Sequence, residues 1–174
     1  MQKSMVGMCL LAALVLLAGC ALGDLRDPTP APPITLPAPP TLMFIGDCER
    51  TAELDYWLQT TTYLAQDFVS QLNTAATTPR EQLYNQVLRL AQLRDAVNAT
   101  ATPTCAVETQ LRLVDAMTTA VSTFQAFANG DLPDLGNVVA EVNAQIDDVM
   151  TVQDQLTQQL EQEYQQQRTP VATP

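Results

Sequence analysis

The chain has no histidine, and its only lysine is Lys3. Without histidine there is no Ser-His-Asp triad, no Cys–His pair and no histidine-ligated haem or metal. The di-iron helical bundles, which need Glu-x-x-His repeats, are excluded for the same reason. Glycine-rich phosphate loops are missing too, since Gly130 and Gly136 stand apart around a turn. These absences remove most of the side-chain patterns from which active sites are built.

Carboxylates are the remaining candidates for chemistry. Asp147 and Asp148 are adjacent in the sequence and therefore point in different directions on a helix. Asp131 and Asp134 flank a turn, but their spacing lacks the ligand density of a calcium site. We therefore predict no catalytic residue, no cofactor-binding residue and no metal ligand, and expect the protein not to be an enzyme.

Positive charge is also scarce. The formal net charge is −11, and it becomes −12 once residues 1–19, which contain Lys3 and no acidic residue, are removed. The arginines are scattered along the chain rather than clustered. Such a surface is repelled by nucleic acid and by anionic lipid head groups. We expect partners that are proteins, cations or neutral molecules, and no nucleic acid.

The N-terminus has the pattern of an export signal. Lys3 precedes an apolar run over residues 5–17, and the small residues Ala18 and Gly19 follow. A basic start, a short apolar run and a small-residue cleavage site are typical of a signal peptide. The alternative is a membrane-spanning helix, which needs about 20 apolar residues and is longer than this run. We predict a signal peptide over residues 1–19.

The motif Leu17-Ala18-Gly19-Cys20 resembles the lipobox of bacterial lipoproteins at every position. The resemblance implies that diacylglycerol is attached to the Cys20 thiol, that the chain is cut before Cys20, and that the new amine is acylated, for example with palmitate. Two or more acyl chains hold a protein stably at a membrane. The alternative is a soluble protein, secreted after cleavage.

The lipobox therefore implies an extracytoplasmic protein anchored to a bacterial membrane. The anchor is expected on the outer face of the cell membrane, or in the outer membrane if the cell has one. Ala21 follows the predicted lipidated cysteine. In a cell whose sorting system reads aspartate at this position as a retention signal, alanine in its place favours the outer membrane.

Residues 20–43 are predicted to be a tether. Prolines crowd the stretch DPTPAPPITLPAPPT over residues 27–41. Proline-rich segments adopt polyproline II and act as semi-rigid spacers, so residues 24–41 would reach roughly 55 Å when fully extended. A disordered linker and a ligand for a proline-recognition domain are the alternatives.

Two cysteines remain after removal of the signal peptide and lipidation of Cys20. Disulfides form and persist outside the cytoplasm, so Cys48 and Cys105 are predicted to pair. The chain-entropy model assigns such a loop about 4 kcal/mol of stability. The alternative is metal binding, but two cysteines without histidine make a poor zinc site.

Beyond residue 44, apolar residues recur at intervals of three and four, which is typical of amphipathic helices. The periodicity predicts four helices, over residues 48–76, 78–99, 103–129 and 133–167.

Local signals predict where some of these helices begin and end. Asp47 is a reasonable cap for the first helix. Thr78, Pro79 and Glu81 have the spacing of a capping box with proline at the first helical position, and so predict the second start. Gly130 is the expected left-handed end of the third helix.

The apolar face of each helix is predicted from the same spacing. The predicted face of the third helix comprises Val107, Leu111, Val114, Val121, Phe124 and Ala128.

Two polar residues fall near the predicted interior. Gln153 is the polar member of a seven-residue apolar repeat in the fourth helix. It would either fix the register or, as we expect, lie in a half-exposed seam near the helix end. Arg94 would either form a buried ion pair with Glu108 or Asp115 or, as we expect, extend to solvent.

Short connections favour an up-down-up-down four-helix bundle over residues 44–168, followed by a disordered tail over residues 169–174. This topology puts Cys48 and Cys105 at the same end, in agreement with the predicted disulfide. Because the tether precedes the first helix, we expect the disulfide end to face the membrane.

The expected function is an interaction or accessory subunit of an envelope protein complex, without catalysis. The alternative is a lipoprotein that binds a small ligand between its helices, and a third possibility is a structural spacer. A polar group inside the bundle would favour the ligand, whereas an exposed apolar patch would favour the protein partner.

Overall fold

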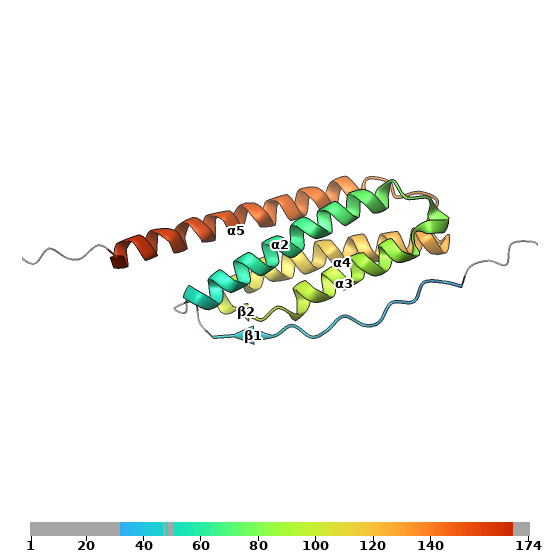
Figure 1. Cartoon of the computed structure of the whole chain (residues 1–174). Coiled ribbons are helices and arrows are strands. Elements are labelled where there is room, and N and C mark those ends of the chain that lie inside the picture. The colour runs from blue at the N-terminus through green and yellow to red at the C-terminus, as the bar shows by residue number, and fades with distance from the viewer. Residues whose placement is uncertain (1–31, 47, 49–50, 169–174) are drawn as a thin grey trace, which may run out of the picture. The chain divides into compact units, whose positions relative to one another are not determined.

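The computed structural model describes residues 32–46, 48 and 51–168. These residues form four α-helices, shown in Figure 1: α2 Thr51–Ala76, α3 Tyr84–Ala99, α4 Val107–Asn129 and α5 Val138–Arg168. All of them belong to one compact unit that begins at Pro33. The predicted signal peptide, Cys20, Asp47 and the predicted tail lie outside the described residues.

Each helix packs mainly against two others. Helices α2 and α4 both contact α3 and α5. Hydrogen bonds join Asn143 to Asn73 at 3.2 Å and Thr62 to Gln153 at 3.2 Å. Because the residue number rises along α2 as it falls along α5, these two helices run in opposite directions.

The core consists of two apolar clusters. The larger one is built from all four helices and contains Phe68, Leu90, Met117 and Ile146. The smaller one joins residues from the first turns of α2 to the second half of α5, and contains Leu54, Trp57, Leu58, Ala106 and Leu160.

The predicted face of α4 is wrong in the first half of that helix. Leu111 is 47% exposed, whereas Thr109, Gln110 and Leu113 are buried. Two of the three buried residues are polar. Because apolar spacing cannot identify polar residues as buried, it predicted Leu111 and Val114 for the buried face in place of Gln110 and Leu113.

The predicted capping box at Thr78 is also wrong. Thr78 lies just past the end of α2, and its Oγ1 donates back to the Thr74 carbonyl in the last turn of that helix, at 2.8 Å. Pro79 instead precedes a short 3₁₀ turn, η1 Arg80–Gln82, and α3 begins only at Tyr84. The last carbonyls of a helix lack intrahelical partners, and one of them accepts the threonine hydroxyl here.

The fourth helix begins later than residue 133. Asp134 Oδ1 accepts from the Gly136 N–H at 2.8 Å, and Gly136 has a φ of 51°. This local turn delays α5 to Val138. Gly130 has a φ of 85° and ends α4, which confirms the predicted left-handed stop.

The predicted disulfide between Cys48 and Cys105 is present, with its Cα atoms 5.8 Å apart. Cys105 lies in a 3₁₀ turn, η2 Thr104–Ala106, directly before α4. The bond thus holds the start of α4 beside the segment that leads into α2. None of the described helices is both long and apolar enough to cross a membrane.

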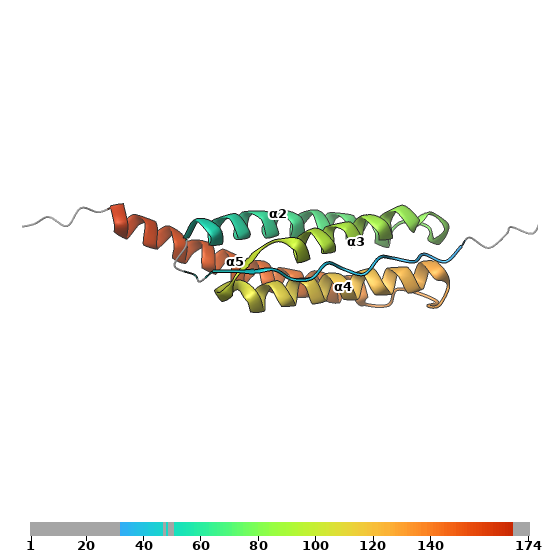
Figure 2. The same cartoon turned by 90° about the horizontal axis from the view of Figure 1, so that it is seen from below.

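From residue 33 onward, the proline-rich segment is extended and lies on the bundle. We call residues 33–45 the strap. Figure 2 shows the strap running lengthwise beside α3 and α4. It ends in β1 Phe44–Ile45, which pairs in parallel with β2 Thr102–Pro103. Residues 33–43, which the sequence assigns to the tether, therefore do not serve as a free spacer.

Candidate functional site

A layer of buried polar side chains crosses the bundle between the two apolar clusters. Thr61, Gln110 and Gln153 form this layer, and each is almost completely buried. Along α5, for example, Gln153 lies between Val149 of the larger cluster and Leu160 of the smaller one.

Gln153 is hydrogen-bonded through both ends of its amide. Its Nε2 donates to Thr61 Oγ1 at 2.8 Å, and its Oε1 accepts from Thr62 Oγ1 at 3.2 Å. The side chain is only 1% exposed. The prediction of a half-exposed seam is therefore wrong, because two threonines of α2 supply an acceptor and a donor across the interface.

Gln110 continues the layer toward α3. Trp57 Nε1 donates to Gln110 Oε1 at 3.1 Å, and Gln110 Nε2 donates to the Val97 carbonyl at 2.5 Å. From its helical spacing Trp57 is expected to be a core residue, with a place in the lining of a lipophilic pocket as the alternative, and Gln110 was not predicted to be a polar partner. The useful signal was the indole N–H, because a buried tryptophan usually finds a hydrogen-bond partner.

Arg94 is buried rather than extended to solvent, contrary to our expectation. It is 5% exposed, and its Nε and Nη2 both donate to Asp95 Oδ1, at 2.8 and 2.7 Å. The neighbouring carboxylate compensates the charge, which allows burial. Glu108 pairs instead with Arg112 at 2.5 Å on the surface of α4.

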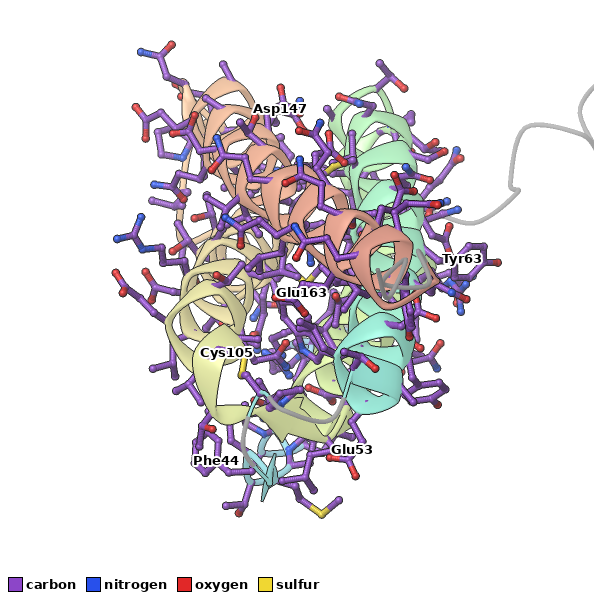
Figure 3. The ribbon with its side chains drawn as sticks, turned by 90° about the vertical axis from the view of Figure 1, so that its left-hand side faces the viewer. Phe44, Glu53, Tyr63, Cys105, Asp147 and Glu163 are labelled. Carbon is purple, nitrogen blue, oxygen red and sulfur yellow. A yellow bond between two sulfur atoms is a disulfide. The ribbon has the colours of Figure 1, made fainter. Side chains whose placement is uncertain are left out.

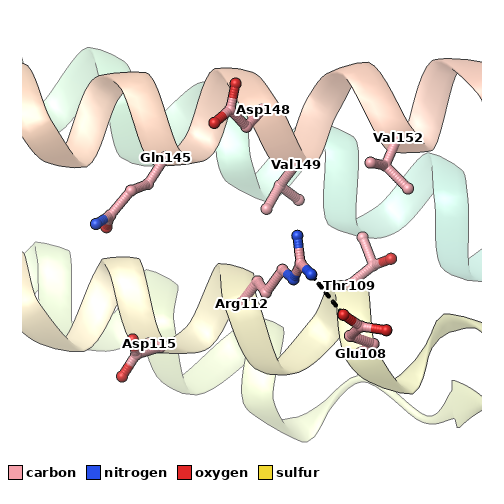
Figure 4. A pocket seen from close by; sticks show the side chains of 8 residues that line it. All are labelled: Glu108, Thr109, Arg112, Asp115, Gln145, Asp148, Val149 and Val152. Atoms are coloured by element: carbon pink, nitrogen blue, oxygen red, sulfur yellow. Dashed lines mark hydrogen bonds and ion pairs between the residues drawn. The ribbon is translucent and has the colours of Figure 1, made fainter.

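A pocket opens between α4 and α5, with a volume of about 420 Å³. Figure 4 shows its lining, which comprises Glu108, Thr109, Arg112, Asp115, Gln145, Asp148, Val149 and Val152. Because Glu108 already pairs with Arg112, Asp115 and Asp148 set the charge of the pocket. Such a lining suits a neutral or cationic molecule with an apolar part.

The adjacent aspartates diverge as their spacing predicts. Asp148 lines the pocket, whereas Asp147 lies on the outer side of α5 in Figure 3. In the described part of the chain, no three cysteine or acidic side chains gather as metal ligands would.

Aromatic side chains are exposed on the outer surface of α2. Tyr63 is 68% exposed, and Tyr56 is exposed to a similar degree. Figure 3 shows Tyr63 on the outer side of the helix. The two residues are seven positions, or about two turns, apart and therefore share one face of α2. We call this pair the tyrosine face.

Comparisons with protein-family models, with curated proteins and with solved structures found no match to this chain. Its function therefore has to be inferred from its own residues.

Proposed function

We propose that the chain is a bacterial lipoprotein with an up-down-up-down four-helix bundle, which acts as an interaction or accessory subunit of an envelope protein complex, without catalysis. The lipid on Cys20 anchors it outside the cytoplasm, and the bundle contacts another protein. The observation that carries the partner function is the tyrosine face.

The lipobox and the disulfide support an extracytoplasmic location independently. The motif Leu17-Ala18-Gly19-Cys20 ends an apolar run that is typical of an export signal. The Cys48–Cys105 bond is of the kind that persists in oxidising compartments. The motif lies in the N-terminal sequence and the disulfide lies in the folded unit, so neither observation depends on the other.

The tyrosine face supports a protein partner. Tyrosine is enriched at protein–protein interfaces, and it has few side-chain rotamers to order on binding. The opposite face of α2 is already buried through Trp57, Phe68 and Leu72. Tyr56 and Tyr63 are thus not needed for the core, and their large exposed rings are available for contact.

The polar groups of the interior support the same conclusion. Gln110, Gln153 and Arg94 each bond to protein atoms. These bonds satisfy the groups that would otherwise favour a ligand inside the bundle.

The test is the native size of the intact protein, extracted in mild detergent from its own membranes. We expect co-migration with a larger complex in fixed stoichiometry. The double variant Tyr56→Ser/Tyr63→Ser should migrate alone, whereas Tyr164→Ser, an aromatic change on α5, should leave the complex intact. Migration of the wild-type protein at its own mass plus detergent would overturn the partner function.

The pocket between α4 and α5 favours a second candidate function, the binding of a small neutral or cationic ligand. Its volume of about 420 Å³ lies within the usual range of ligand sites. Native mass spectrometry of the protein released from its membranes should then show a small bound molecule, and Asp148→Asn should weaken its retention. If the spectra of the wild-type protein show no mass beyond that of the lipidated chain itself, this function is excluded.

A further inference from the structure

The strap enters the bundle at the end where α4 finishes. The Ile34 N–H donates to Asn129 Oδ1 at 2.8 Å, and Gln125 Nε2 donates to the Ile34 carbonyl at 2.8 Å. Ile34 is 8% exposed and belongs to the larger core cluster. Because Asn129 is the last residue of α4, the backbone of Ile34 is fixed at that end.

The strap leaves the bundle surface at the opposite end, beside the disulfide. The Pro40 carbonyl accepts a hydrogen bond from Asn98 Nδ2, close to the end of α3. The Met43 carbonyl then accepts from the Thr102 N–H at 2.9 Å, where β1 and β2 pair. The strap therefore traverses the bundle lengthwise, as Figure 2 shows.

The connections α2–α3 and α4–α5 meet at the end where the strap enters. We call this the loop end and define it as residues 77–83 and 130–137. Arg80 joins the two connections, because its Nη2 donates to the carbonyls of Leu132 at 3.0 Å and Pro133 at 2.9 Å. Its guanidinium also lies 4.2 Å from the centroid of the Phe127 ring. The loop end is thus a single cross-linked face.

We propose that the strap sets the orientation of the bundle at the membrane. The loop end faces the membrane, and the disulfide end points away from it, together with the last turns of α5, which extend past the start of α2 in Figure 1. This orientation rests on the proposed lipid anchor at Cys20. It is opposite to the one expected from a tether that joins the first helix directly.

The length of the remaining tether supports this orientation. From Cys20 to Pro33 the chain spans about 13 residues, or roughly 40 Å when fully extended as polyproline II. Helix α4, with 23 residues, is roughly 35 Å long. Placing the disulfide end at the membrane would therefore require almost the whole tether to lie stretched along the bundle, at a large cost in conformational entropy.

Energy transfer to lipid tests the orientation. The full-length lipidated protein is inserted into neutral phosphatidylcholine vesicles that carry an acceptor dye on the head groups. A donor dye is placed either at the loop end, through Asp131→Cys, or on the extension of α5, through Glu163→Cys; both side chains are exposed. We expect several-fold greater transfer from position 131.

The possible failures of this experiment are distinguishable. Equal transfer from the two positions, or greater transfer from position 163, would overturn the orientation while leaving the anchor intact. If the protein does not bind the vesicles at all, the anchor itself is wrong and the orientation fails with it. The Cys20→Ala variant shows what unanchored protein gives in the same assay.

A strap variant tests whether the docked strap sets the orientation. Ile34→Asp places a charge in the core and should release the strap, so transfer from position 163 should rise relative to position 131. Thr35→Asp adds the same charge at an exposed neighbour and should leave both values unchanged. Circular dichroism checks that both variants keep their helices. Identical transfer patterns for the two variants would overturn the role of the strap.

Discussion

Gln153 of α5 and Thr61 of α2 are joined by a buried hydrogen bond of 2.8 Å, donated by Gln153 Nε2 to Thr61 Oγ1. Thr61 Oγ1 in turn donates to the Trp57 carbonyl at 2.7 Å. Trp57 Nε1 donates to Gln110 Oε1, and Gln110 Nε2 donates to the Val97 carbonyl. A single set of side-chain hydrogen bonds therefore connects all four helices.

Removing the amide of Gln153 should destabilise the bundle. Gln153→Ala removes the two hydrogen bonds of a side chain that is only 1% exposed and leaves Thr62 Oγ1 without its acceptor, and we expect a loss of about 1–3 kcal/mol. Urea unfolding should show this loss. Gln155→Ala, an exposed glutamine on the same helix, should change the free energy of unfolding by less than about 0.5 kcal/mol. Equal stabilities of the two variants would contradict the buried layer.

Trp57→Phe should have a cost that apolar packing alone does not explain. Phenylalanine keeps most of the apolar volume but removes the indole N–H, so Gln110 Oε1 loses its donor. We expect a loss of about 1–3 kcal/mol. In the double variant Trp57→Phe/Gln110→Leu, the loss should be smaller than the sum of the two single losses. Additive losses in a double-mutant cycle would show that the two side chains are not coupled.

Reduction of the disulfide should lower stability by about 4 kcal/mol, because the long loop between Cys48 and Cys105 gains freedom in the unfolded chain. Thermal unfolding with and without reductant measures this effect. The double variant Cys48→Ser/Cys105→Ser should match the reduced protein and be insensitive to reductant. Unfolding that is unaffected by reductant in the parent protein would contradict the pairing.

Gly130→Ala should destabilise the end of α4. Its φ of 85° is costly for residues with a Cβ, although a Cβ at this position would have no atom within 4 Å. We expect a loss of about 1–2 kcal/mol from backbone strain alone. Gly130→Asn should lose less, because asparagine tolerates the left-handed region. If both variants unfold like the parent protein, the left-handed end is not required.

Apolar spacing predicted the parts of the fold that depend on burial of apolar side chains. The buried faces of α2 and α3, for example Phe68 and Leu90, follow the three- and four-residue spacing. The pairing of Cys48 with Cys105 followed from cysteine number and helix order. These features arise from the hydrophobic effect and from simple connectivity, and a sequence shows both directly.

Features that depend on a polar partner from a distant segment were not predictable in the same way. Gln153 looks like an interruption of an apolar repeat until Thr61 and Thr62 lie opposite it. The strap looks like a free spacer until Asn129 and Gln125 bond the backbone of Ile34. The sequence contains these donors and acceptors, but only the tertiary fold brings them together.

The most direct test of the central claim is the intact mass of the protein extracted from its native membranes. We expect a chain that begins at Cys20, with a diacylglyceryl group on the Cys20 thiol and a further acyl chain on its amine. A mass that still includes the predicted signal peptide, or that of a chain beginning at Cys20 without lipid, would contradict this proposal.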